Sequence, residues 1–114
     1  MAKTSAKREQ AELLQGILDL LILRTLDANP LHGWGISKSI RRMSKEVLTV
    51  NQGSLYPALY RLELAGLIEG EWGKSDEGRD AKFYSLTRAG RKQLKEENEY
   101  WLLFSRAVND ILGA

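Results

Sequence analysis

The chain has 114 residues, of which 43% are hydrophobic and 28% are charged. This composition is typical of a folded globular protein and argues against a wholly disordered chain, and the length fits one domain with a single modest core. The formal net charge is only +2, which permits an anionic partner without requiring one. The absence of cysteine excludes disulfides and thiolate chemistry and fits a reducing compartment.

Residues 1–8 carry three basic side chains and no acid, and we expect them to form a flexible basic arm. Acidic and polar residues follow this arm rather than an apolar core, so we expect no signal peptide. The apolar run at 17–23 is far shorter than the about 20 residues that cross a bilayer. These features predict a cytoplasmic protein without a membrane segment.

Residues 9–28 are predicted to form the first helix, because leucine and isoleucine cover much of its circumference. Asn29-Pro30 ends it. A second helix is expected from Gly33 to about Ser44, followed by a short β-favouring segment at 47–50. His32 is expected to serve as a turn or capping residue, and Trp34 is expected in the core.

A third helix is predicted between Asn51, a suitable N-cap, and Gly66, a natural stop. Its leucines at 55, 59 and 62 form a stripe that packs inward. Pro57 fits comfortably only in a first turn, so the helix either begins near Ser54 or is kinked.

Two strands at 67–74 and 82–86, joined by a polar connection at 75–80, are predicted to form a hairpin. Thr87 then caps a final helix that runs to about Leu112. This order predicts a mostly α (α+β) fold, a winged helix-turn-helix with a long C-terminal dimerisation helix. The expected parts are the arm at 1–8, a DNA-binding domain at 9–86 and the dimerisation helix at 87–114.

The start of the third helix carries the side chains that a DNA-reading helix needs. Gln52 can pair with an adenine edge, and Ser54 with a base or a phosphate. Tyrosine and arginine farther along can reach phosphates, and a glycine allows close approach of the backbone. The predicted DNA-binding residues of this helix are Asn51, Gln52, Gly53, Ser54, Tyr56, Tyr60 and Arg61. The alternative is a helix that serves only the core.

The hairpin supplies two further predicted DNA contacts, Arg79 and Lys82. Three acids in the same segment offset their charge, Asp76, Glu77 and Asp80. A solvated turn is therefore an equal alternative to a wing that touches DNA.

The final helix carries an apolar seam with heptad-like spacing, formed by Leu94, Trp101, Phe104, Val108 and Ile111. A core of this size has little room for the whole seam, so we expect a homodimer through this helix, with the first helix contributing. Packing of the seam within one chain is the alternative.

Catalytic and metal sites are not indicated. The single histidine has no second histidine or cysteine with which to build a zinc site, and no nucleophile-and-base set or phosphate-binding glycine loop is visible. We expect neither an enzyme nor a bound cofactor.

Four linked motifs resemble the PadR family of bacterial transcriptional regulators, in the small form with one C-terminal helix. They are the segments at 31–36, 53–62, 66–68 and 82–87, the last followed by Gly90. The resemblance covers roughly residues 13–112. Family members usually have tyrosine where this chain has Trp34, a change that could alter a pocket or a packing contact.

This resemblance implies a dimeric repressor that binds double-stranded DNA at a palindromic operator. It also implies a small aromatic effector at the dimer interface, beside Trp101 and Phe104 with Leu14 and Leu18 of the first helix. The rival interpretation is a winged-helix protein-interaction module without DNA binding.

Overall fold

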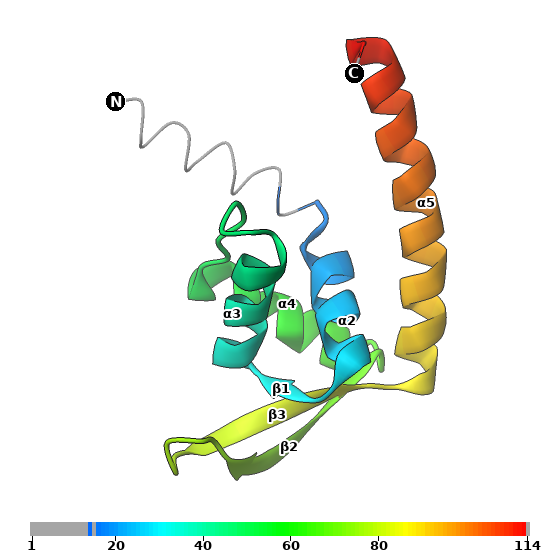
Figure 1. Cartoon of the computed structure of the whole chain (residues 1–114). Coiled ribbons are helices and arrows are strands. Elements are labelled where there is room, and N and C mark those ends of the chain that lie inside the picture. The colour runs from blue at the N-terminus through cyan, green and yellow to red at the C-terminus, as the bar shows by residue number, and fades with distance from the viewer. Residues whose placement is uncertain (1–13, 15, 114) are drawn as a thin grey trace.

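The computed structural model describes residue 14 and residues 16–113 and has one layer of helices above a small sheet (Figure 1). The predicted arm at 1–8 lies outside the described residues. In chain order the elements are α2 (Leu18–Ala28), β1 (Leu31–His32), α3 (Gly33–Met43), α4 (Gln52–Leu64), β2 (Ile68–Lys74), β3 (Asp80–Leu86) and α5 (Arg88–Leu112).

The first predicted helix is interrupted in the described residues. Leu14 is helical, but Gly16 and Ile17 form a turn, and α2 begins at Leu18. The prediction of one continuous helix from residue 9 is therefore wrong. Glycine is a poor helix former, because its backbone loses more freedom than that of any other residue, and Gly16 stands at the break.

α3 and α4 form the helix-turn-helix, and both begin at the capping residues that the sequence indicates. His32 Nδ1 accepts the Gly35 amide at 2.9 Å, and Asn51 Oδ1 accepts the Ser54 amide at 2.9 Å. α4 starts at Gln52, so the alternative of a start near Ser54 is wrong and Pro57 lies inside the helix. Pro57 has no amide hydrogen, so it cannot donate to the carbonyl of Gly53.

The segment 47–50 is not a strand, although its residues favour one. It follows two residues in the left-handed region, Lys45 and Glu46, with φ of 54° and 71°. The Leu48 amide donates to the Ser44 hydroxyl at 2.9 Å instead of to a neighbouring strand. The segment therefore serves as the loop between α3 and α4.

The sheet has three antiparallel strands in the order β1-β3-β2. The hairpin register pairs Ile68 with Leu86 and Lys74 with Asp80, so β3 begins two residues earlier than predicted. The tight loop at 75–79 explains this, because the Ser75 amide donates to the Arg79 carbonyl at 2.8 Å and Gly78 takes a φ of +78°. β1 was not predicted, since two residues carry no periodicity.

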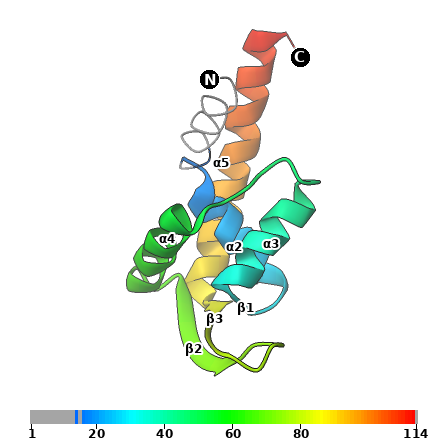
Figure 2. The same ribbon diagram turned by 90° about the vertical axis from the view of Figure 1, so that its left-hand side faces the viewer.

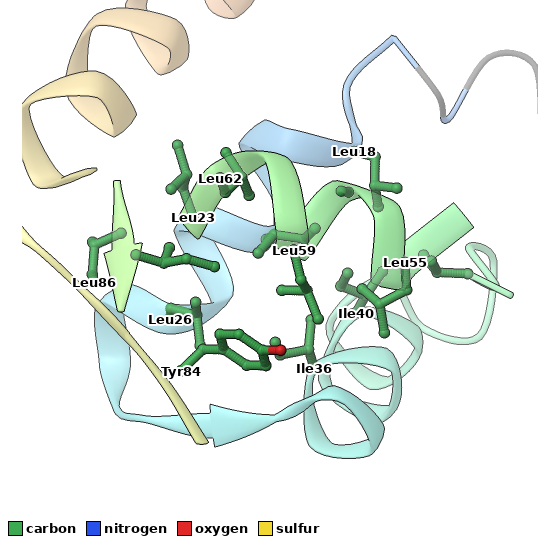
Figure 3. Packing of buried hydrophobic residues seen from close by; sticks show 14 of the residues in the cluster. Leu18, Leu23, Leu26, Ile36, Ile40, Leu55, Leu59, Leu62, Tyr84 and Leu86 are labelled. Atoms are coloured by element: carbon green, nitrogen blue, oxygen red, sulfur yellow. The ribbon is translucent and has the colours of Figure 1, made fainter. Parts of the chain in front are cut away.

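The core lies between the helices and the inner face of the hairpin (Figure 3). All three leucines of the α4 stripe are buried in it, as predicted. Tyr84 and Leu86 close it from β3, and Ile36 and Ile40 contribute from α3. This packing fixes the orientation of α4, and so decides which of its side chains face solvent.

Near its beginning, α5 packs on the domain. Thr87 Oγ1 accepts the Gly90 amide at 3.0 Å, which confirms the predicted cap, and Gly90 and Leu94 are the buried residues of this helix. The remainder extends beyond the other helices (Figure 2). In the described part of the chain, no helix has the length and apolar character needed to cross a membrane.

Candidate nucleic-acid interface

One face of α4 is free for a partner while the opposite face holds the core. Leu55, Leu59 and Leu62 are buried, whereas Tyr56 and Tyr60 keep 47% and 67% of their surface exposed. The four residues at 51–54 are also exposed. The predicted division of this helix into a packing stripe and an exposed tyrosine face is therefore confirmed.

The side chains at the start of α4 are not equally available. Asn51 Oδ1 is occupied by the Ser54 amide, so Asn51 has its amide group left for a further contact. Gln52 and the Ser54 hydroxyl have no hydrogen bond among the interactions of the described residues. These two side chains are the freest polar groups at the start of the helix.

Tyr56 is held against the start of α3. A methyl group added at Gly33 would lie 2.8 Å from the Tyr56 hydroxyl oxygen and 3.0 Å from Cζ. The ring therefore occupies the space that a side chain at Gly33 would fill. This close packing fixes the direction in which Tyr56 leaves α4.

Two predicted DNA-binding cations are engaged within the chain. Arg61 pairs with Asp19 of α2 at 3.1 Å, and Lys82 pairs with Glu63 of α4 at 2.9 Å. The hydrogen bond that Lys82 donates to the Glu63 carboxylate raises the pKa of Lys82 above its ordinary value. Arg61 lies nine residues after Gln52, about 14 Å along the helix axis. The structure thus separates Arg61 from the start of α4.

The hairpin has one cation without an ion pair among the described residues, Arg79. Lys74 pairs with Asp80 at 2.6 Å. The pKa of Glu77 is lowered by a backbone hydrogen bond and by the Ser75 hydroxyl, so Glu77 stays anionic at neutral pH. The three acids Asp76, Glu77 and Asp80 therefore equal in number the three cations of this segment, Lys74, Arg79 and Lys82.

A cleft of about 760 Å³, here called the wing cleft, opens between the hairpin and the beginnings of α3 and α4. Aromatic side chains dominate its walls, and Arg79 and Lys82 also line it; the aromatic residues are His32, Trp34, Tyr56, Trp72 and Tyr84. Trp72 was not predicted as a site residue, because the strand alternation alone does not show that its side chain is exposed beside this cleft.

Trp34 is 56% exposed, so the expectation that it lies in the core is wrong. It precedes the buried Ile36 by two residues, which places the two side chains about 200° apart around α3. Lys38, one turn later on the same face, has its Nζ 5.8 Å from the centre of the Trp34 ring. The helix therefore presents Trp34 to the wing cleft and Ile36 to the core.

A second cavity of about 980 Å³, here called the α5 cavity, lies between α5 and the beginning of α2. Trp101, Phe104 and Val108 line it, whereas Ile111 lies beyond it and is 85% exposed. Leu14 and Leu18, expected beside these residues, are buried in the core instead. Their half-buried neighbours Ile17 and Leu20 line the cavity instead.

Three carboxylates, Asp19, Glu96 and Glu97, also line the α5 cavity, and among the described residues of its lining there is no lysine or arginine. Tyr100 and Trp101 each place a ring centre 6.2 Å from that of Phe104. The described residues contain no group of three metal-ligating side chains. The cavity thus combines aromatic walls with negative charge.

Comparisons with known proteins agree with this geometry. The family described as Transcriptional regulator PadR-like matches residues 22–96. The chain is 35% identical over 102 residues to Transcriptional regulator Rv3488 of Mycobacterium tuberculosis, covering 90% of this chain and 89% of that protein.

Solved structures give the same result. A transcriptional regulator from Clostridium thermocellum superposes with a TM-score of 0.78 at 30% identity, covering 87% of this chain and 96% of that one. A PadR family regulator from Eggerthella lenta gives 0.77 at 27% identity, covering 97% and 95%. The resemblance seen in the motifs is confirmed, and the protein is a DNA-binding regulator and not an enzyme. The chain belongs to the PadR-like family of transcriptional regulators.

Proposed function

We propose that this regulator is a repressor that binds a palindromic operator as a homodimer, with α4 of each protomer in the major groove. The observation that carries the proposal is the free polar start of α4, where Gln52, Ser54 and Tyr56 face solvent while the leucine stripe holds the helix. Helix-turn-helix proteins read bases with the first turns of this helix.

The dimer is supported by the outer part of α5. After Leu94 the apolar side chains of the helix are no longer buried, and Phe104 and Ile111 keep about half or more of their surface exposed. An apolar stripe of this kind favours association with a second copy. Two-fold symmetry would place two α4 helices about 34 Å apart, one turn of DNA, and would match a palindrome.

The α5 cavity supports a small aromatic effector. Its rings at Tyr100, Trp101 and Phe104 offer stacking surfaces, and its volume is within the range of small-molecule sites. The three carboxylates favour a neutral or cationic aromatic molecule over an anionic one. Binding there would change the angle between the two α4 helices, provided that the ligand favours one of the two arrangements.

Titration of a fluorescent duplex from the protein's own upstream region tests the proposal. Gln52→Ala and Tyr56→Ala should each weaken binding about tenfold while the chain keeps its oligomeric state, since each removes a contact worth about 1–3 kcal/mol. Asn98→Ala, an exposed amide on α5, serves as the matched control for Gln52 and should leave the affinity unchanged. Unchanged DNA affinity in both α4 variants would contradict the assignment of α4.

A further inference from the structure

We propose that the wing cleft seats the sugar-phosphate backbone of one DNA strand, with the rings of Trp34 and Trp72 packed against deoxyribose. This inference rests on the proposed docking of α4 in the major groove. It adds two DNA-contacting residues that lie on α3 and β2, outside the reading helix.

Two tryptophans, Trp34 and Trp72, expose large aromatic rings on the surface of this small domain. Trp34 is 56% exposed and Trp72 is 72% exposed, and both line the same cleft although they belong to different elements. Large exposed apolar surfaces of monomeric proteins commonly mark interaction sites. The two rings therefore point to a shared partner in the cleft.

The register of the hairpin explains how Trp72 comes to stand there. Ile68, Gly70 and Trp72 alternate onto one face of β2, and Ile68 on that face is buried in the core. Trp72 continues the face past the point at which the core ends. Its ring is therefore directed to the same side of the sheet as α4.

Lys82 sets the position of the hairpin against α4. Its aliphatic stem lies over Gly70, in the space that a side chain there would need, and its Nζ reaches Glu63 of α4 at 2.9 Å. The same Nζ lies 5.6 Å from the centre of the Tyr84 ring. Lys82 thus links the wing to α4 along the wall of the wing cleft.

The cleft lies where a DNA strand would pass. Tyr56 of α4 forms part of its wall, and the start of α3 forms another part. In helix-turn-helix complexes the helix before the reading helix crosses the DNA backbone. A duplex that contacts Gln52 and Tyr56 would therefore run its backbone along Trp34 and into the cleft.

The charged side chains of the hairpin indicate which groups of the DNA backbone the wing cleft contacts. Lys74 and Lys82 are paired with Asp80 and Glu63, so Arg79 is the wing cation available to a phosphate among the described residues. Glu77 lines the cleft and opposes a phosphate. Asp76 and Glu77 accompany Arg79 in the same loop, so the wing offers aromatic surface without an excess of positive charge, which suits the apolar faces of the sugars better than the phosphates.

Tryptophan fluorescence tests the inference, because the chain has three tryptophans and the third, Trp101, lies on α5. Pairwise substitution by phenylalanine leaves a single tryptophan at 34, 72 or 101, and the DNA affinity of each variant is measured first. Acrylamide quenching is then recorded with and without saturating duplex. We expect the quenching constant to fall at least twofold for Trp34 and Trp72, and to stay unchanged for Trp101.

Affinity gives the second readout. Trp34→Ala and Trp72→Ala should each weaken DNA binding about fivefold without changing its salt dependence, because no charge is removed. Arg79→Ala should reduce the slope of log affinity against log salt by about one. Glu77→Gln should strengthen binding about twofold. Circular dichroism and the thermal midpoint confirm that each variant is folded.

The outcomes separate the two proposals. If the unaltered protein does not bind duplex DNA, the proposed function fails. If it binds with the expected dependence on Gln52, but Trp34 and Trp72 stay as quenchable as in the free protein, the inference about the cleft alone is overturned. Protection of these tryptophans by a small aromatic molecule but not by DNA would likewise overturn it.

Discussion

At the scale of single residues, the close approach of Gly33 and Tyr56 sets the position of a ring on the surface that we propose to face DNA. Gly33→Ala would place a methyl group 2.8 Å from the Tyr56 hydroxyl and displace the ring. Because the displaced group is the end of a side chain and alanine favours the helix, we expect little change in the thermal midpoint. DNA affinity, measured by fluorescence anisotropy, should fall about fivefold.

Gly35→Ala is the matched control for this change, since it adds the same group two residues later on α3. The nearest atom to the new methyl group would be the Leu31 side-chain end at 3.2 Å, away from Tyr56. Its DNA affinity should match that of the unaltered protein. Equal losses in both variants would show that α3, and not Tyr56, is responsible.

Single residues also show what the sequence could predict. The capping roles of His32, Asn51 and Thr87 depend on neighbours three residues away, so local reasoning found them. The ion pairs of Arg61 and Lys82 join residues 42 and 19 positions apart in the chain. No local pattern reveals such partners, and both cations were therefore predicted as free DNA contacts.

At the scale of elements, the attachment of α5 depends on one glycine. A side chain at Gly90 would collide with the carbonyl oxygen of Leu67 and with the Leu86 side chain. The same carbonyl accepts the Thr87 amide at 3.1 Å, and the Thr87 hydroxyl donates to the Gly66 carbonyl at 2.7 Å. The turn at Gly66 and Leu67, which follows α4, thus fixes the direction in which α5 leaves the domain.

Gly90→Ala should destabilise the domain by about 1–3 kcal/mol, the usual cost of overpacking, because a backbone carbonyl cannot move aside cheaply. Urea unfolding followed by circular dichroism measures this change. Arg88→Ala, an exposed position in the same turn, should change stability by less than about 0.5 kcal/mol. A Gly90→Ala midpoint equal to that of the unaltered protein would contradict the close packing of this corner.

Elements with strong periodicity or clear end signals were predicted correctly, namely α3, α4, α5 and the hairpin. The failures have physical causes. The segment 47–50 has β-favouring residues but forms the loop that follows the left-handed residues Lys45 and Glu46, and β1 is too short for a pattern. The break at Gly16 arises from a single residue inside an apolar stretch.

At the scale of the whole molecule, α5 extends beyond the globular part of the domain, against which its first turns pack (Figure 2). Its 25 residues span about 37 Å, whereas its buried residues, Gly90 and Leu94, belong to the first two turns. The sequence predicted this helix, and a homodimer through its apolar seam stays a prediction. The placement of Leu14 and Leu18 in the core could not be predicted, because it depends on how α2 turns against the other helices.

The most direct test of the account is sedimentation of the protein with and without a labelled duplex at low ionic strength. Without DNA, the protein should sediment with twice the 12.9 kDa mass of one chain. With DNA, it should form a complex that holds two chains on each duplex. A single chain in solution at micromolar concentration, or no co-sedimentation with DNA, would contradict it.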